Sequence, residues 1–126
     1  MTSRTVLVVD DHPSNVKLIS VLLRNRGFGV VAARSAIEVW SVLDREPPGL
    51  ILMDIQLPGT DGLTLTRQIR ERTAFRSIPI VAVTAYAMDR DRIAAHAAGC
   101  DEFMSKPIDG VELGILVERL LSERAS

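Results

Sequence analysis

The chain has few of the residues that mark secreted or membrane-bound proteins. It holds one cysteine, Cys100, among 126 residues, so no disulfide forms within the chain, and a reducing compartment is indicated. No apolar run approaches the roughly 20 residues that a membrane-spanning helix needs, and Asp10 and Asp11 interrupt the only early hydrophobic segment. The sequence therefore predicts a cytoplasmic protein with no membrane partner.

An excess of charge of one sign is also lacking. The 15 basic residues balance 16 acidic ones, with a formal net charge of −1. No basic stripe could hold nucleic-acid phosphates, so we expect no nucleic-acid partner. Lysine is scarce: Lys17 and Lys106 are the only two, against 13 arginines. A lysine at 106 indicates a position where a compact ammonium acts in a way that a guanidinium fork would not.

What is present is the composition of one globular domain. Apolar residues make up 47% of the chain and charged residues 25%, proportions that support a hydrophobic core. The length suits one domain and is too short for two. We expect residues 1–126 to form a single domain with no output domain.

Short apolar runs alternate five times with segments of helical period. We expect strands near residues 5–9, 28–33, 50–53, 78–83 and 102–104, and helices near 13–26, 35–45, 63–71, 90–98 and 109–122. Strands that are apolar along their whole length are typical of a parallel sheet covered on both faces. The sequence thus predicts an α/β fold, a doubly wound (βα)5 five-stranded parallel sheet of flavodoxin-like type with helices on both faces.

Polar residues follow four of these strands directly. Asp10 and Asp11 come after the first, Asp54 after the third, Thr84 after the fourth and Lys106 after the fifth. Ligands of such sheets bind beyond the carboxyl ends of the strands, where these side chains should converge. Helix caps on a solvated rim are the alternative explanation, but four strand ends would have to carry them at once.

Three converging carboxylates repel one another, and the usual remedies are protonation, a buried cation or a hard metal ion. Carboxylate oxygens in an incomplete cage, with room for water and phosphate, are typical of a Mg²⁺ site. Lys106 can neutralise part of the remaining charge or hold a phosphate oxygen. His12 also follows the acid pair, and we expect it to be a solvated loop residue beside a metal that prefers oxygen.

These residues together resemble the signature of the response-regulator receiver family, of the CheY-like superfamily, over essentially the whole chain. The matching positions are Asp10-Asp11, Asp54 with Pro58 and Gly62, Thr84-Ala85 and Lys106-Pro107. The segments at residues 52–58 and 84–88 are especially similar to stand-alone receivers of the DivK type and to receivers attached to hybrid kinases.

The resemblance implies a role for each matching residue. Asp54 would be the phosphoacceptor. Asp11 and Asp54 would bind Mg²⁺ through their side chains, Gln56 through its backbone carbonyl, and Asp10 largely through water. Thr84 and Lys106 would each contact a phosphoryl oxygen.

Three further implications concern the switch and its surroundings. Phe103 occupies the position of the switch aromatic that moves with Thr84. Gln56 and Tyr86 occupy positions that modulate hydrolysis of the phosphoryl group. The family usually has a cis peptide bond at the position of Lys106-Pro107.

The implied function is that of a phosphoacceptor switch rather than an enzyme, beyond self-catalysed phosphotransfer and slow autodephosphorylation. A sensor histidine kinase or a histidine phosphotransfer protein would donate the phosphoryl group, and phosphorylation would alter a surface that contacts a downstream protein. The alternative within the family is a receiver domain from a hybrid histidine kinase or multidomain regulator.

Two enzyme classes fail on particular residues. A phosphatase of the haloacid dehalogenase type needs a second aspartate two residues after its nucleophile, and that position holds Gln56. A dinucleotide-binding domain needs G-x-G-x-x-G after the first strand, and residues 10–15 contain no glycine.

Overall fold

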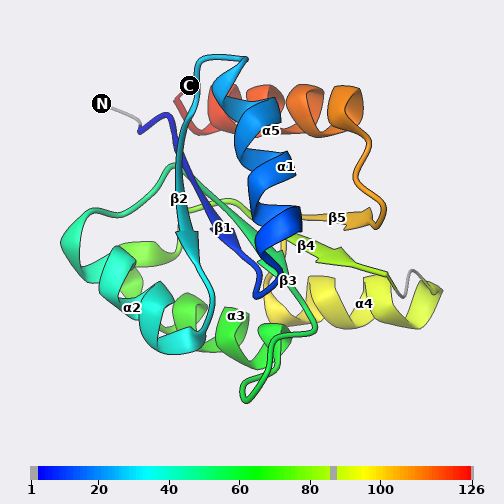
Figure 1. Ribbon diagram of the computed structural model, residues 1–126. Coiled ribbons are helices and arrows are strands. Elements are labelled where there is room, and N and C mark those ends of the chain that lie inside the picture. Colours follow the sequence, from blue (N-terminus) through cyan, green and yellow to red (C-terminus); the bar gives the residue numbers. More distant parts are fainter. Residues whose placement is uncertain (1–2, 86–87, 126) are drawn as a thin grey trace.

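The computed structural model describes residues 3–85 and 88–125. Strands and helices alternate along the chain (Figure 1). One short 3-10 helix, η1, lies between α3 and β4. The elements are β1 Thr5–Val9, α1 Pro13–Arg24, β2 Gly29–Ala33, α2 Ala36–Arg45, β3 Leu50–Asp54, α3 Gly62–Glu71, η1 Thr73–Phe75, β4 Ile80–Thr84, α4 Asp89–Ala98, β5 Glu102–Ser105 and α5 Gly110–Ala125.

The five strands form one parallel sheet in the order β2-β1-β3-β4-β5. This is the flavodoxin-like order, so the predicted fold class is confirmed. The central strand β3 is buried along its whole length, as expected for a parallel strand covered on both faces. Among the described residues, no helix is both long and apolar enough to span a membrane.

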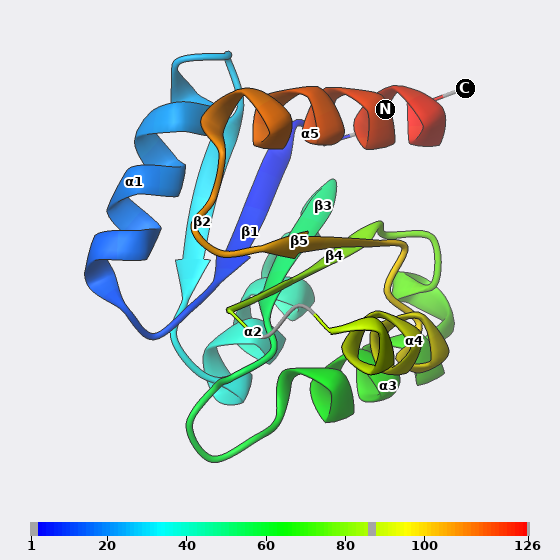
Figure 2. The same ribbon diagram turned by 90° about the vertical axis from the view of Figure 1, so that its right-hand side faces the viewer.

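Alternation along the strands divides the core into two layers. Leu7 and Ile51 point toward α2, α3 and α4, while their neighbours Val8 and Leu52 point toward α1 and α5. Figure 2 shows α1 and α5 on one face of the sheet and the other three helices on the opposite face. Helices therefore cover both faces of the sheet.

The boundaries differ from the expectations by a few residues. Helix α1 ends at Arg24 rather than residue 26, because the chain turns through Gly27, whose φ of 88° is readily adopted by glycine. Helix α5 continues to Ala125. The 3-10 turn Thr73–Phe75 was not predicted, since its sequence has no helical period and its geometry follows from burying Phe75.

Candidate functional site

An acidic cluster lies at the carboxyl ends of the parallel strands, here called the carboxyl edge of the sheet, where β1 and β3 end side by side. The two strands pair as far as Val9 with Met53, so the residues that follow are brought close together. The side chains of Asp10 and Asp54 are only 4% and 2% exposed, while that of Asp11 is 31% exposed. Two buried carboxylates and a third at the rim therefore share one small volume.

Lys106 supplies the positive charge at the centre of the cluster. Its Nζ atom lies 3.1 Å from Asp54 Oδ2 and 3.6 Å from Asp10 Oδ2. The backbone N–H of Gln56 donates to Asp54 Oδ1 at 3.0 Å. Burial raises the pKa of Asp54, while Lys106 and the Gln56 N–H act in the opposite direction and the nearby Asp10 adds to the rise. One ammonium does not balance three carboxylates.

Asp11 shows where a cation fits. Its Oδ1 atom is buried and accepts no hydrogen bond from the residues that the structure describes. A buried carboxylate oxygen without a donor is costly unless a positive charge faces it. Asp10, Asp11, His12 and Asp54 each offer one ligand atom, and these atoms lie within 4.8 Å of one another. The oxygen-rich donor set fits a divalent cation such as Mg²⁺.

Thr84 completes the cluster on the side of β4. Its side chain is buried, and its Oγ1 atom accepts a 2.7 Å hydrogen bond from the side-chain amide of Gln56. Its carbonyl accepts a hydrogen bond from the backbone N–H of Lys106 at 2.8 Å. The peptide bond between Lys106 and Pro107 is cis. The ends of β3, β4 and β5 are thus joined through Thr84.

Phe103, on β5, is partly buried and packs against the core layer that includes residues of α2, α3 and α4. The guanidinium carbon of Arg92, from α4, lies 4.8 Å from the centre of that ring. Sequence reasoning missed Arg92, because no local pattern tells which arginine of an exposed helix reaches a neighbouring strand. Tyr86, expected to modulate hydrolysis, lies outside the described residues.

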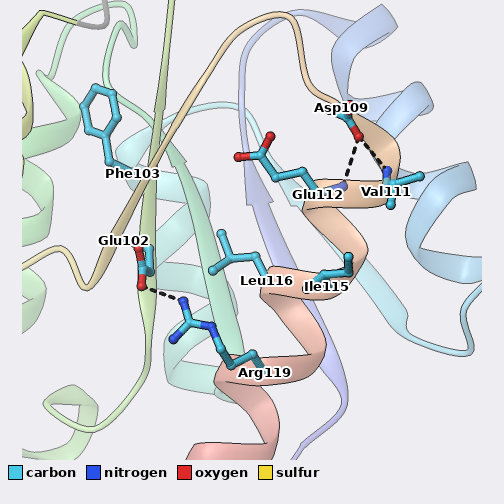
Figure 3. A pocket seen from close by; sticks show the side chains of 8 residues that line it. All are labelled: Glu102, Phe103, Asp109, Val111, Glu112, Ile115, Leu116 and Arg119. Atoms are coloured by element: carbon cyan, nitrogen blue, oxygen red, sulfur yellow. Dashed lines mark hydrogen bonds and ion pairs between the residues drawn. The ribbon is translucent and has the colours of Figure 1, made fainter.

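A hollow of about 540 Å³ opens beside Phe103, between β5 and α5. Figure 3 shows Ile115 and Leu116 of α5 among its lining residues and an ion pair between Glu102 and Arg119. Asp109 accepts two backbone hydrogen bonds that cap the start of α5. Strand β5 carries Glu102 and Phe103, which line the hollow, and it is followed directly by Lys106 of the acidic cluster.

The sequence profile of the response regulator receiver domain matches residues 6–118. The chain therefore belongs to the response regulator receiver domain family. Over 121 residues it is 38% identical to the response regulator Rre1 of a Synechocystis species, covering 95% of this chain and 52% of Rre1. Over 106 residues it is 38% identical to the polar-differentiation response regulator DivK of Brucella abortus, covering 84% of this chain and 86% of DivK.

Solved structures with the same fold include a response regulator and the receiver domain of a sensor kinase. A two-component response regulator from Clostridium difficile superposes with a TM-score of 0.90 at 26% identity, covering all of both chains. The receiver domain of the sensor histidine kinase PA1611 from Pseudomonas aeruginosa superposes with a TM-score of 0.86 at 33% identity, covering 96% of this chain and 99% of that one. That structure has a magnesium ion coordinated in the active-site cleft.

Proposed function

We propose that this receiver accepts a phosphoryl group on Asp54 from a sensor histidine kinase or a histidine phosphotransfer protein. The observation that carries the proposal is the position of Asp54: it is the buried last residue of the central strand, bonded to Lys106 at 3.1 Å and to the Gln56 N–H. Receiver domains take phosphoryl groups from histidine kinases and bind Mg²⁺ in the active site. By sequence profile, the chain is such a domain.

Transfer breaks the phosphorus–nitrogen bond of a phosphohistidine and forms a phosphorus–oxygen bond to the Asp54 carboxylate. The nucleophile must be ionised, and the pair with Lys106 favours the ionised form. Such transfers require positioning and charge neutralisation more than covalent chemistry by the protein. Asp11, Asp54 and the Gln56 carbonyl would hold Mg²⁺, with Asp10 acting through water. When bound, the ion neutralises charge on the phosphoryl oxygens.

The switch is proposed to run from Thr84 to Phe103. Thr84 Oγ1 uses one of its lone pairs for the Gln56 amide, and its O–H can donate to a phosphoryl oxygen. A new charge of about −1.5 to −2 on Asp54 attracts that donor inward. Phe103 can then repack beneath Arg92, which alters the hollow between β5 and α5. A downstream protein that contacts this surface would sense the change.

A second candidate is the receiver of a hybrid kinase or multidomain regulator. The likeness to the PA1611 receiver supports it, and the chain spans about half of the length of Rre1. Both candidates share the same chemistry at Asp54. We also propose that the described residues act as one domain and that the protein is cytoplasmic, in keeping with a single buried cysteine.

Phosphorylation with acetyl phosphate and Mg²⁺ tests the assignment of Asp54. We expect the wild type to gain one phosphoryl group on a phosphate-affinity gel and by intact mass, and Asp54→Asn to gain none. Asp44→Asn, at an exposed acid of α2, is the matched control and should react as the wild type does. Undiminished phosphorylation of Asp54→Asn would show that another residue is the acceptor.

A further inference from the structure

The turn between β1 and α1 brings an imidazole nitrogen into the acidic cluster. The backbone N–H of His12 donates to Asp10 Oδ1 at 2.9 Å, which fixes this residue at the start of α1. Its Nδ1 atom lies 3.3 Å from Asp10 Oδ1 and 3.2 Å from Asp11 Oδ1. The side chain is 63% exposed, as expected for a loop residue. Its ring nitrogen nevertheless faces two carboxylates.

One hydrogen bond does not explain both contacts. The hydrogen bond of this ring nitrogen is to Asp10 Oδ1, and the buried Asp11 Oδ1 accepts none from the described residues despite its proximity. In a six-coordinate site with metal–ligand distances of about 2.1 Å, adjacent ligand atoms lie about 3 Å apart. The spacings from Nδ1 to the two oxygens are close to that value. A cation bound by Nδ1 and Asp11 Oδ1 would supply the positive charge that this buried oxygen lacks, with Asp10 reached through water.

We propose that His12 is a metal ligand that sets the metal preference of this receiver toward transition metals. The inference rests on the proposed function only in sharing its acidic cluster. Mg²⁺ takes oxygen ligands and rarely uses imidazole, whereas imidazole suits Zn²⁺ and other first-row transition metals well. His12 therefore adds most binding energy for Zn²⁺, less for Mn²⁺ and little for Mg²⁺. The carboxylates of Asp11 and Asp54 contribute to all three.

Metal titrations of the full chain test the proposal. Dissociation constants for Mg²⁺, Mn²⁺ and Zn²⁺ are measured by calorimetry for wild type, His12→Ala and Asp11→Ala. Because divalent metals differ in affinity at any site, the informative quantity is the ratio between variants for one metal. His12→Ala should weaken Zn²⁺ binding about ten-fold or more and Mg²⁺ binding less than about two-fold. Asp11→Ala should weaken all three.

His96 provides the matched control, since it is an exposed histidine on α4. His96→Ala should leave the Zn²⁺ affinity of the acidic cluster unchanged. Electron spin echo spectra of the Mn²⁺ complex give a direct readout, because a coordinated imidazole nitrogen modulates the echo. That modulation should be present in wild type and His96→Ala and lost in His12→Ala.

Equal Zn²⁺ affinity in wild type and His12→Ala would overturn the proposal, as would a wild-type Mn²⁺ spectrum without nitrogen modulation. Acetyl-phosphate labelling in Mg²⁺ separates this outcome from failure of the proposed function. If His12→Ala and wild type bind every metal alike while Asp54 is still phosphorylated, the metal preference alone is wrong. Undiminished labelling of Asp54→Asn would refute the phosphoacceptor and leave the metal comparison intact.

Discussion

An ion pair lies at each end of the parallel strands: one at the amino edge, where the strands begin, and one at the carboxyl edge, where they end. The two pairs differ in how completely their hydrogen-bonding groups are used. At the edge where the strands begin, Arg70 of α3 contacts Asp101, just before β5, at 2.8 Å. At the edge where they end, Lys106 contacts Asp54 at 3.1 Å. The first pair is saturated with partners, and the second lies in a group with too little positive charge.

The Arg70 guanidinium joins segments that are far apart in the sequence. Besides Asp101, it donates to four backbone carbonyls, those of Gly99, Phe75, Arg76 and Ile78. Asp101 Oδ2 in turn accepts the backbone N–H of Ile80 at 2.8 Å. The planar fork of arginine, with its several donors, suits this arrangement. The pair closes the ends of α3 and α4 onto the start of β4.

The cluster around Lys106 is the opposite case. The carboxylates of Asp10, Asp11 and Asp54 lie together, and the Lys106 ammonium contacts Asp10 and Asp54. A buried oxygen of Asp11 has no hydrogen-bond donor among the described residues. A saturated network has nothing left with which to bind a ligand, whereas a network short of positive charge attracts cations. The comparison indicates that the amino edge maintains the fold and the carboxyl edge gives up stability for binding.

The largest expected effect is at the saturated edge. Arg70→Ala leaves four carbonyls and Asp101 without their shared donor, so we expect a loss of about 3 kcal/mol of unfolding free energy in urea. Arg70→Lys keeps the charge but loses the planar fork of donors, so its unfolding free energy should lie between those of wild type and Arg70→Ala. Arg67→Ala, on an exposed position of the same helix, should change stability by less than about 0.5 kcal/mol. Equal effects of Arg70→Ala and Arg67→Ala would remove the contrast.

Mg²⁺ that binds at the carboxyl edge should stabilise the folded protein against unfolding by mass action. At a concentration ten times the dissociation constant, the gain is about 1.4 kcal/mol. Melting temperature should therefore rise with Mg²⁺ in wild type and in Asp44→Ala, the exposed control on α2. Asp11→Ala should show no such rise, because it removes the oxygen that lacks a hydrogen bond. A matching rise in Asp11→Ala would contradict the assignment of Asp11 as a ligand.

Without Mg²⁺ at pH 7, Asp54→Asn should stabilise the fold. Burial raises the pKa of Asp54, so the folded chain binds this proton more readily than the unfolded chain does. The ionised carboxylate therefore costs stability above its folded pKa, and the cost disappears as pH falls through that pKa.

Urea unfolding at several pH values measures this effect. The stability of wild type should approach that of Asp54→Asn as pH is lowered toward the folded pKa of Asp54. A variant that is less stable than wild type at pH 7 would mean that the bond to Lys106 outweighs the cost of burial.

The smallest expected effect concerns Arg92, an exposed residue of α4 that contacts Phe103 of β5. Its guanidinium over Phe103 is an exposed cation–π contact, for which about 0.5 kcal/mol is typical. Arg92→Ala should speed amide exchange over β5, while Arg90→Ala, on the same helix, should not. Identical exchange in the two variants would show that Arg92 does not restrain Phe103.

Much of the fold was predictable because its signals are local. Strands β1 to β4 are mainly apolar runs, and Gly99, with a φ of 110°, ends α4 where the sequence predicts a stop. Parallel order and right-handed connections then leave few topologies. Residues that directly follow strands were expected to meet, and Asp10, Asp54 and Lys106 do lie together.

By itself, the sequence determined the class of fold, the edge at which the site lies and the residue types that form it, because periodicity and position after a strand are properties of the chain. Only the tertiary structure decided which side chains from different elements contact one another. Gln56 with Thr84, Arg92 with Phe103, and Arg70 with Asp101 are such pairs. Their contacts depend on helix rotation and side-chain reach, which follow from the packing of the two core layers.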